Sequence, residues 1–171
     1  MTKFDAAMDR DANRQVLTGD YPFRTKRTIT FAGATTDAWG DDGGALDGAA
    51  IFTVTGVVYA KLIAACITSL DSDGAATVAI GISGATTIFM PTETATQIDA
   101  GQIWVNDAAN ADYIIAGEEA AAVDNIPEYL LNGNDIILTV AGAANVTAGV
   151  LDFYALWKPI SNDGSIVATT T

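Results

Sequence analysis

Apolar residues alternate with small or polar ones through much of the chain after residue 24. Ala76, Val78, Ile80 and Ile82 would line one face of an extended segment, because successive side chains of a strand point to opposite sides. The same period-two spacing recurs in other segments, at Ile29 and Phe31, at Ile136, Leu138 and Val140, and over 150–158. This alternation predicts strands that bury one face, which is typical of antiparallel sheets.

Turn signals separate these segments. Asp71-Ser72-Asp73-Gly74 is typical of a turn, and Asn132-Gly133 between apolar runs predicts another. A short strand is expected over 102–105, and a strand over 86–90 is expected to end at Pro91. Roughly eight to ten short strands follow from these signals, with no helix of ordinary length after residue 24. The fold class is therefore predicted to be all-β, an antiparallel β-sandwich or jelly roll.

Residues 49–70 form the longest apolar stretch, long enough in principle for a transmembrane helix. Lys61 lies near its centre, Gly56 interrupts it, and β-branched residues dominate it. We therefore expect two successive buried strands here and no membrane partner.

Basic residues are concentrated at the N-terminus. Residues 1–27 hold six of the eight basic residues and four acids, a net charge of +2. The remaining 144 residues hold two basic residues and 17 acids, a net charge of −15. Such a body repels nucleic acid, whereas the N-terminal segment suits a negatively charged partner. The basic residues expected to make these contacts are Arg10, Arg14, Arg24, Lys26 and Arg27.

Three parts of the chain follow from this reading. Residues 1–23 are expected to form a docking arm, extended or partly helical over 5–17. Residues 24–160 would form the sandwich domain, and residues 161–171 a polar C-terminal tail.

Composition argues against an enzyme. The chain has no His and a single Cys, so Ser-His-Asp and Cys-His catalysis and Cys/His zinc sites cannot be assembled. Cys66 lies in an apolar run, which predicts a small buried side chain. No phosphate-binding loop, signal peptide or cofactor motif is recognisable, and no cofactor is expected.

Acidic clusters leave two alternatives open. Asp71-Ser72-Asp73-Gly74 resembles the opening of a calcium loop but lacks the later acidic ligand, and Asp41-Asp42 with Asp47 offers similar groups. Both are also typical of solvated turns, so no metal site is assigned. Paired carboxylates could cleave glycosides, but nothing in the sequence places two of them across a groove.

The tryptophans differ in their surroundings. Trp157 shares the period-two register of a strand, which predicts a core position, whereas Trp39 and Trp104 lie in or beside polar loops. The latter two are candidate interface aromatics.

Three stretches carry a family resemblance: GATTDAWGDDGGALDGAAIFTVTGVV (33–58), IPEYLLNGNDIILTVAGAANVTAGVLDFYALWKP (126–159) and LDFYALWKPISNDGSIVA (151–168). Together they cover much of the chain after residue 24, and they resemble small structural proteins of tailed bacteriophages. The resemblance implies a virion protein of the capsid decoration (cement) type, with no site residues carried over. It also implies self-association, typically as a homotrimer, and the major capsid protein as partner.

The expected function is therefore a non-enzymatic virion protein, made in the host cytoplasm, that binds the outer capsid surface and stabilises the shell by bridging subunits. Deleting residues 1–27 is expected to abolish capsid binding and to leave the thermal transition of the fold in place. The alternatives are a tail, fibre or baseplate component that binds carbohydrate through Trp39 or Trp104, and a glycan-degrading enzyme.

Overall fold

The computed structural model of the chain describes residues 21–35, 37–106, 114–115 and 126–170. These residues form an antiparallel β-sandwich, which confirms the predicted fold class. The arm residues Arg10 and Arg14, and the helix expected over 5–17, lie outside the described residues.

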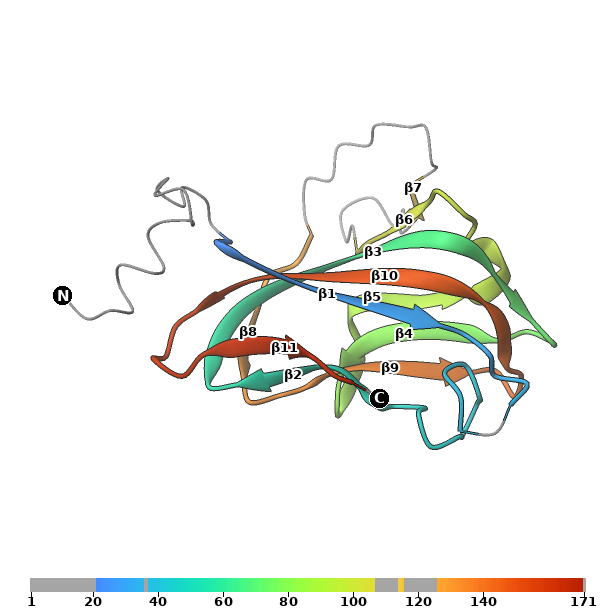
Figure 1. Cartoon of the computed structure of the whole chain (residues 1–171), viewed down its shortest axis with the longest axis horizontal. Coiled ribbons are helices and arrows are strands. Elements are labelled where there is room, and N and C mark those ends of the chain that lie inside the picture. The colour runs from blue at the N-terminus through green and yellow to red at the C-terminus, as the bar shows by residue number, and fades with distance from the viewer. Residues whose placement is uncertain (1–20, 36, 107–113, 116–125, 171) are drawn as a thin grey trace.

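Two sheets make the sandwich (Figure 1). The first sheet has the strand order β1-β10-β3-β6-β7, and β8 also pairs with β3; the second has the order β11-β2-β9-β4-β5. One short 3-10 helix, η1, follows β5. The elements are β1 (Phe23–Thr30), β2 (Ala50–Thr55), β3 (Val57–Ser72), β4 (Thr77–Ile82), β5 (Ala85–Thr94), η1 (Ala95–Gln97), β6 (Ile103–Trp104), β7 (Ile114–Ile115), β8 (Tyr129–Asn132), β9 (Ile136–Ala141), β10 (Val146–Pro159) and β11 (Ser165–Ala168).

The core lies between the two sheets, because each strand turns alternate side chains inward. On β3 these are small or aliphatic residues such as Ala60, Leu62 and Ala64, which are fully buried. The neighbouring strand β10 contributes larger groups, including Phe153 and Trp157. Small side chains on β3 beside large ones on β10 fill the interior without crowding.

The apolar stretch 49–70 forms two successive strands, β2 and β3, as expected from its composition. Gly56 separates them with a φ of +62°, a conformation that favours glycine. Because β2 and β3 belong to different sheets, Gly56 is where the chain crosses between the two layers. Among the described residues, no helix has the length and hydropathy needed to cross a membrane.

Three expected boundaries are wrong. The expected boundary at residue 23 is wrong, because Phe23 begins β1 and stacks on Trp157 at 4.6 Å between ring centroids. The tail expected over 161–171 contains β11, whose Ile166 is buried against the core. β5 continues through Pro91, because an edge strand tolerates the missing backbone N–H.

Candidate functional site: the cationic outer face of the first sheet

Every Lys and Arg among the described residues lies on β1, β3 or β10, three neighbouring strands of the first sheet. The strands of the second sheet contain none. Along β1, exposed and less exposed residues alternate, so Arg24 and Lys26 point outward while Thr25 and Ile29 point inward. The outer face of the first sheet is therefore the described surface on which positive charge collects.

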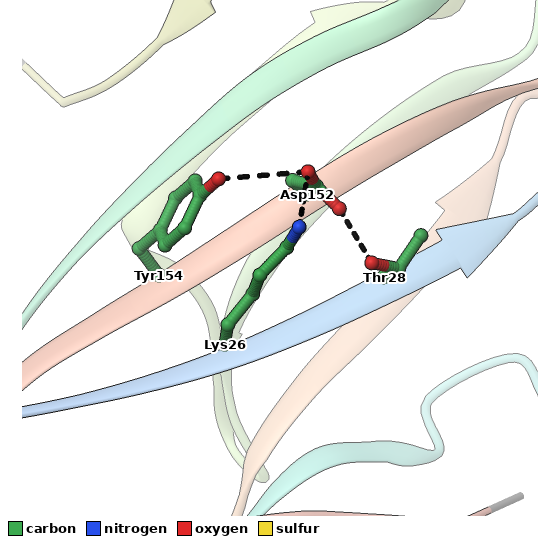
Figure 2. Close-up of polar contacts among 4 residues, drawn as sticks. All are labelled: Lys26, Thr28, Asp152 and Tyr154. Carbon is green, nitrogen blue, oxygen red and sulfur yellow. Dashed lines mark hydrogen bonds and ion pairs between the residues drawn. The ribbon is translucent and has the colours of Figure 1, made fainter.

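Arg24 and Lys26 on β1 form what we call the β1 cationic strip. The Lys26 Nζ atom lies 2.7 Å from an Asp152 carboxylate oxygen, and the Thr28 hydroxyl donates a hydrogen bond to the other oxygen (Figure 2). The Tyr154 hydroxyl approaches the same carboxylate at 3.5 Å. Three side chains from two strands thus converge on Asp152.

The charge state of Asp152 follows from these contacts. Burial alone would raise its pKa, but the hydrogen bonds from Lys26 and Thr28 and the Lys26 charge outweigh burial, so the pKa lies below its usual value. The hydrogen bond and charge of Asp152 in turn raise the pKa of Lys26. The Lys26 side chain is still 48% exposed, so part of it is open to a partner.

Tyr154 also orders the arginine of the strip. The Arg24 guanidinium carbon and the Lys26 Nζ atom each lie 5.7 Å from the centre of the Tyr154 ring. Cations at this distance over an aromatic face are attracted by its negative charge distribution. Tyr154 therefore holds both cations of the β1 cationic strip beside one another.

A second group of cations lies further across the same face, and we call Tyr21, Tyr59, Lys61 and Lys158 the lysine–tyrosine cluster. The Nζ atoms of Lys61 and Lys158 lie 5.0 and 5.2 Å from the centre of the Tyr21 ring. Lys158 also lies 4.9 Å from the centre of the Tyr59 ring and 3.4 Å from a Glu128 carboxylate oxygen. Hydrogen bonding to Tyr21 and the Lys158 charge lower the pKa of Glu128.

Strand register connects the two groups. Arg24 pairs with Leu156, and Leu156 pairs with Lys61, so the three residues form one row across β1, β10 and β3. The neighbouring row runs from Lys158 through Tyr59 to Leu130 on β8. Cations, tyrosines and aliphatic side chains therefore share this face, and its tyrosines and Arg24 are of the types enriched at protein-binding surfaces.

The structure separates the residues that the sequence grouped together. Arg24 and Lys26 lie on the outer face, but Arg27 points inward and its guanidinium lies 6.0 Å from the centre of the Trp39 ring. Burial lowers the pKa of Arg27. Arg27 thus belongs to the packing at the sandwich edge and does not extend the cationic strip.

The interpretation of Trp39 and Trp104 as interface aromatics is wrong. Trp39 is 7% exposed and Trp104 fully buried. Trp104 lies opposite the inward-facing Ala64 of β3, which directs its indole into the core. Nothing in the sequence indicated that Trp104 is buried, because its strand β6 has two residues and is too short to show an alternating pattern.

Lys61, Lys158 and the three tyrosines were missed as site residues. Lys61 and Lys158 are isolated cations in apolar strand sequences, far apart along the chain. Only the antiparallel pairing of β3 with β10 brings them together. The one sequence signal for these two lysines was that each is a charged residue at an outward-facing position of a strand with an alternating pattern.

The carboxylates of Asp47 and Asp73 make structural hydrogen bonds, and the thiol of Cys66 is buried. No group of three or more Cys, Asp or Glu side chains within the described ranges is arranged to hold a metal ion. The Asp47 carboxylate accepts hydrogen bonds from the backbone N–H groups of Val140 and Gly43, and Asp73 accepts them from Asn145. Burial, with a smaller effect of Asp99, raises the pKa of Cys66 to about 11.

A shallow apolar hollow lies where the loop before β2 meets the end of β11. Leu46, Ala49, Ala50, Thr53 and Ala168 are among the residues that line it. None of its lining residues carries a charge, so the hollow offers no acid, base or cation for catalysis.

Comparison of the chain with protein-family models, curated proteins and solved structures returned no match.

Proposed function

We propose that this chain is a non-enzymatic structural protein of a phage virion, which binds the outside of the capsid as a decoration protein and bridges capsid subunits. The observation that carries the proposal is the β1 cationic strip, which exposes Arg24 and Lys26 on a chain of net charge −13. A capsid protein with acidic groups on its outer surface is the partner that this charge distribution fits. The strip immediately follows the N-terminal segment that carries Arg10 and Arg14, so the two can contribute to one docking surface.

The order of the strip supports docking. Asp152 and Tyr154 hold Lys26 and Arg24 in place, so little side-chain entropy remains to be lost when a partner binds. The surrounding sandwich has a closely packed core between two hydrogen-bonded sheets. The carbohydrate-binding alternative depended on Trp39 and Trp104, and the burial of both rings removes its basis.

Deletion of residues 1–27 cannot separate loss of the arm from damage to the fold. Removing residues 1–27 takes away Phe23–Arg27, five of the eight residues of β1, and would damage the sheet itself. Deletion of residues 1–20 leaves all of β1 in place. Loss of capsid binding by the shorter deletion can then be assigned to the arm.

The function is tested by co-sedimentation with shells assembled from the major capsid protein of the same phage. The variant Arg24→Gln/Lys26→Gln lowers the net charge by two, and the amide introduced at position 26 can still donate a hydrogen bond to Asp152. Thr53→Glu/Thr86→Glu lowers the net charge equally at exposed positions of the second sheet. We expect the first variant to bind shells about tenfold more weakly than the second. Equal binding by both variants, or no binding by the wild-type chain, contradicts the proposal.

A further inference from the structure

The lysine–tyrosine cluster is an ordered surface with two lysines, one of them paired with Glu128, that the β1 cationic strip does not include. Lys158 is 31% exposed and Lys61 half-buried, and both ammonium groups are held by the Tyr21 ring. Two aliphatic side chains nearby, Leu130 and Ile160, are more than half exposed. Ordered cations on this surface are complementary to a protein partner that presents carboxylates.

The opposite end of the sandwich carries a matching group of carboxylates. We call Asp42, Asp71 and Asp73 the acid-rich end. Asn145 connects the loops that carry them: its side-chain oxygen accepts a hydrogen bond from the Asp42 N–H, and its backbone and side-chain N–H groups donate to Asp73. The three turns involved, 37–48, 71–76 and 141–146, contain no Lys or Arg.

Small residues surround these carboxylates. Asp71 and Asp73 are exposed, and the neighbouring turn carries the exposed residues Gly142 and Ala143. Ala143 has a φ of +54°, which keeps this turn tight. The turns 71–76 and 141–146 contain only small or polar residues apart from Val146, which is buried.

One copy of the chain cannot bring these two surfaces together. Tyr59 lies near the start of β3, and Asp71 lies near its end, twelve residues further along the same strand. An extended backbone rises about 3.3 Å per residue, which places them roughly 35–40 Å apart. Figure 1 shows β3 running from one end of the sandwich to the other.

We propose that the lysine–tyrosine cluster binds the acid-rich end of a second copy of this chain. The argument is charge complementarity: Lys61 and Lys158 would lie against carboxylates that a neighbouring copy holds in place through Asn145. Each copy then presents one surface of each kind, so two copies can exchange both contacts in a twofold dimer, or the contact can repeat head to tail into a ring or a chain. This inference goes beyond capsid binding, because it uses different residues from the β1 cationic strip.

A matched pair of variants tests whether the position of the charge matters. Lys61→Gln/Lys158→Gln and the control Thr53→Glu/Thr86→Glu both have a net charge of −15. The mass of each full-length variant is measured by sedimentation at a series of concentrations. We expect self-association to weaken at least tenfold in the lysine variant relative to the control, and Lys61→Arg/Lys158→Arg to retain it. A monomeric wild-type chain, or equal association of lysine variant and control, overturns the proposal.

Ionic strength alone is a poor test, because salt screens the attraction between the two surfaces and also the repulsion between chains of net charge −13. A charge exchange separates these effects. Lys61→Glu/Lys158→Glu reverses the cluster, and Asp42→Lys/Asp71→Lys reverses two members of the acid-rich end. Asp73 is left unchanged because its carboxylate accepts two hydrogen bonds from Asn145.

Each reversed variant alone should be monomeric. Mixed with the wild-type chain, the Lys61→Glu/Lys158→Glu chain should bind only through its unchanged acid-rich end, because its own cluster now repels the wild-type acid-rich end. When the two reversed variants are mixed, the negative cluster of the Lys61→Glu/Lys158→Glu chain can bind the positive end of the Asp42→Lys/Asp71→Lys chain. We therefore expect a mixed complex. Circular dichroism and thermal unfolding confirm that every variant is folded. Failure of folded variants to associate on mixing overturns the proposal, whatever the outcome of the capsid-binding experiment.

Discussion

Thr25 connects the two sheets at one edge of the sandwich, and replacing its hydroxyl should lower stability measurably. The Thr25 hydroxyl accepts a hydrogen bond from the Trp157 indole N–H at 3.0 Å and donates one to the Ile166 carbonyl of β11 at 2.8 Å. β1 and β11 are edge strands of different sheets. The substitution Thr25→Val keeps the shape of the side chain and removes both hydrogen bonds.

The expected loss follows from the burial of the two partners. Ile166 is 2% exposed and Trp157 is 9% exposed, so neither group is readily hydrated once the hydroxyl is gone. A hydrogen bond contributes about 1 kcal/mol net, and a buried group left without a partner costs about 1–3 kcal/mol. We expect the free energy of unfolding to fall by about 2–3 kcal/mol. For a chain of 171 residues this lowers Tm by roughly 5–10 °C.

Urea unfolding followed by tryptophan fluorescence and by circular dichroism measures this loss. Thr30→Val is the matched control, because Thr30 lies on the same strand with an exposed side chain. If Thr25→Val and Thr30→Val differ by less than about 0.5 kcal/mol, the proposed contribution of the bridging hydroxyl is refuted.

Three further outcomes follow from the structure. Asp152→Asn should lower the free energy of unfolding at neutral pH by about 1 kcal/mol, since it removes the ion pair with Lys26 and weakens the hydrogen bond from Thr28. Because folding lowers the pKa of Asp152, the stability that its carboxylate contributes is present above the usual carboxyl pKa and is lost as pH falls through the lower folded pKa. In urea titrations, the difference in unfolding free energy between wild type and variant should therefore be largest at neutral pH and shrink at acid pH. A difference that stays constant with pH would contradict the assignment. Cys66, with a pKa of about 11, should react with a thiol reagent at mildly alkaline pH only as fast as the chain unfolds, and rapid labelling of the native protein would show that the thiol is accessible. Gly33→Ala should lower Tm, because the added methyl group overlaps the backbone carbonyls of Gly40 and Val146; an unchanged Tm would show that this loop can move apart.

The strands that the sequence predicted well are those with a long alternating pattern. The inward positions of β4 and β9 could be read directly from residues such as Val78, Ile80 and Leu138, all of which are buried. The turn at Asn132-Gly133 was equally clear, and Gly133 has a φ of +67°. β11 was missed, because its four residues include a single buried side chain and are too few to show an alternating pattern.

The candidate site was predictable only in part. Arg24 and Lys26 could be identified from the concentration of basic residues near the N-terminus, but the opposite orientation of Arg27 depends on where β1 begins. Lys61 and Lys158 could not be grouped at all, because their proximity depends on the register between β3 and β10.

The sequence alone determined that the chain is all-β, where most of its strands and turns lie, and that its N-terminal part carries most of the basic residues. These properties are local, because the alternation of side chains and the preferences of turn residues arise from a few neighbouring backbone units. Only the tertiary structure decided which strands are neighbours, in which register they pair, and that cations from β1, β3 and β10 share one face. Strand order and register depend on hydrogen bonds and core contacts between residues far apart in the chain, and no local pattern encodes that choice.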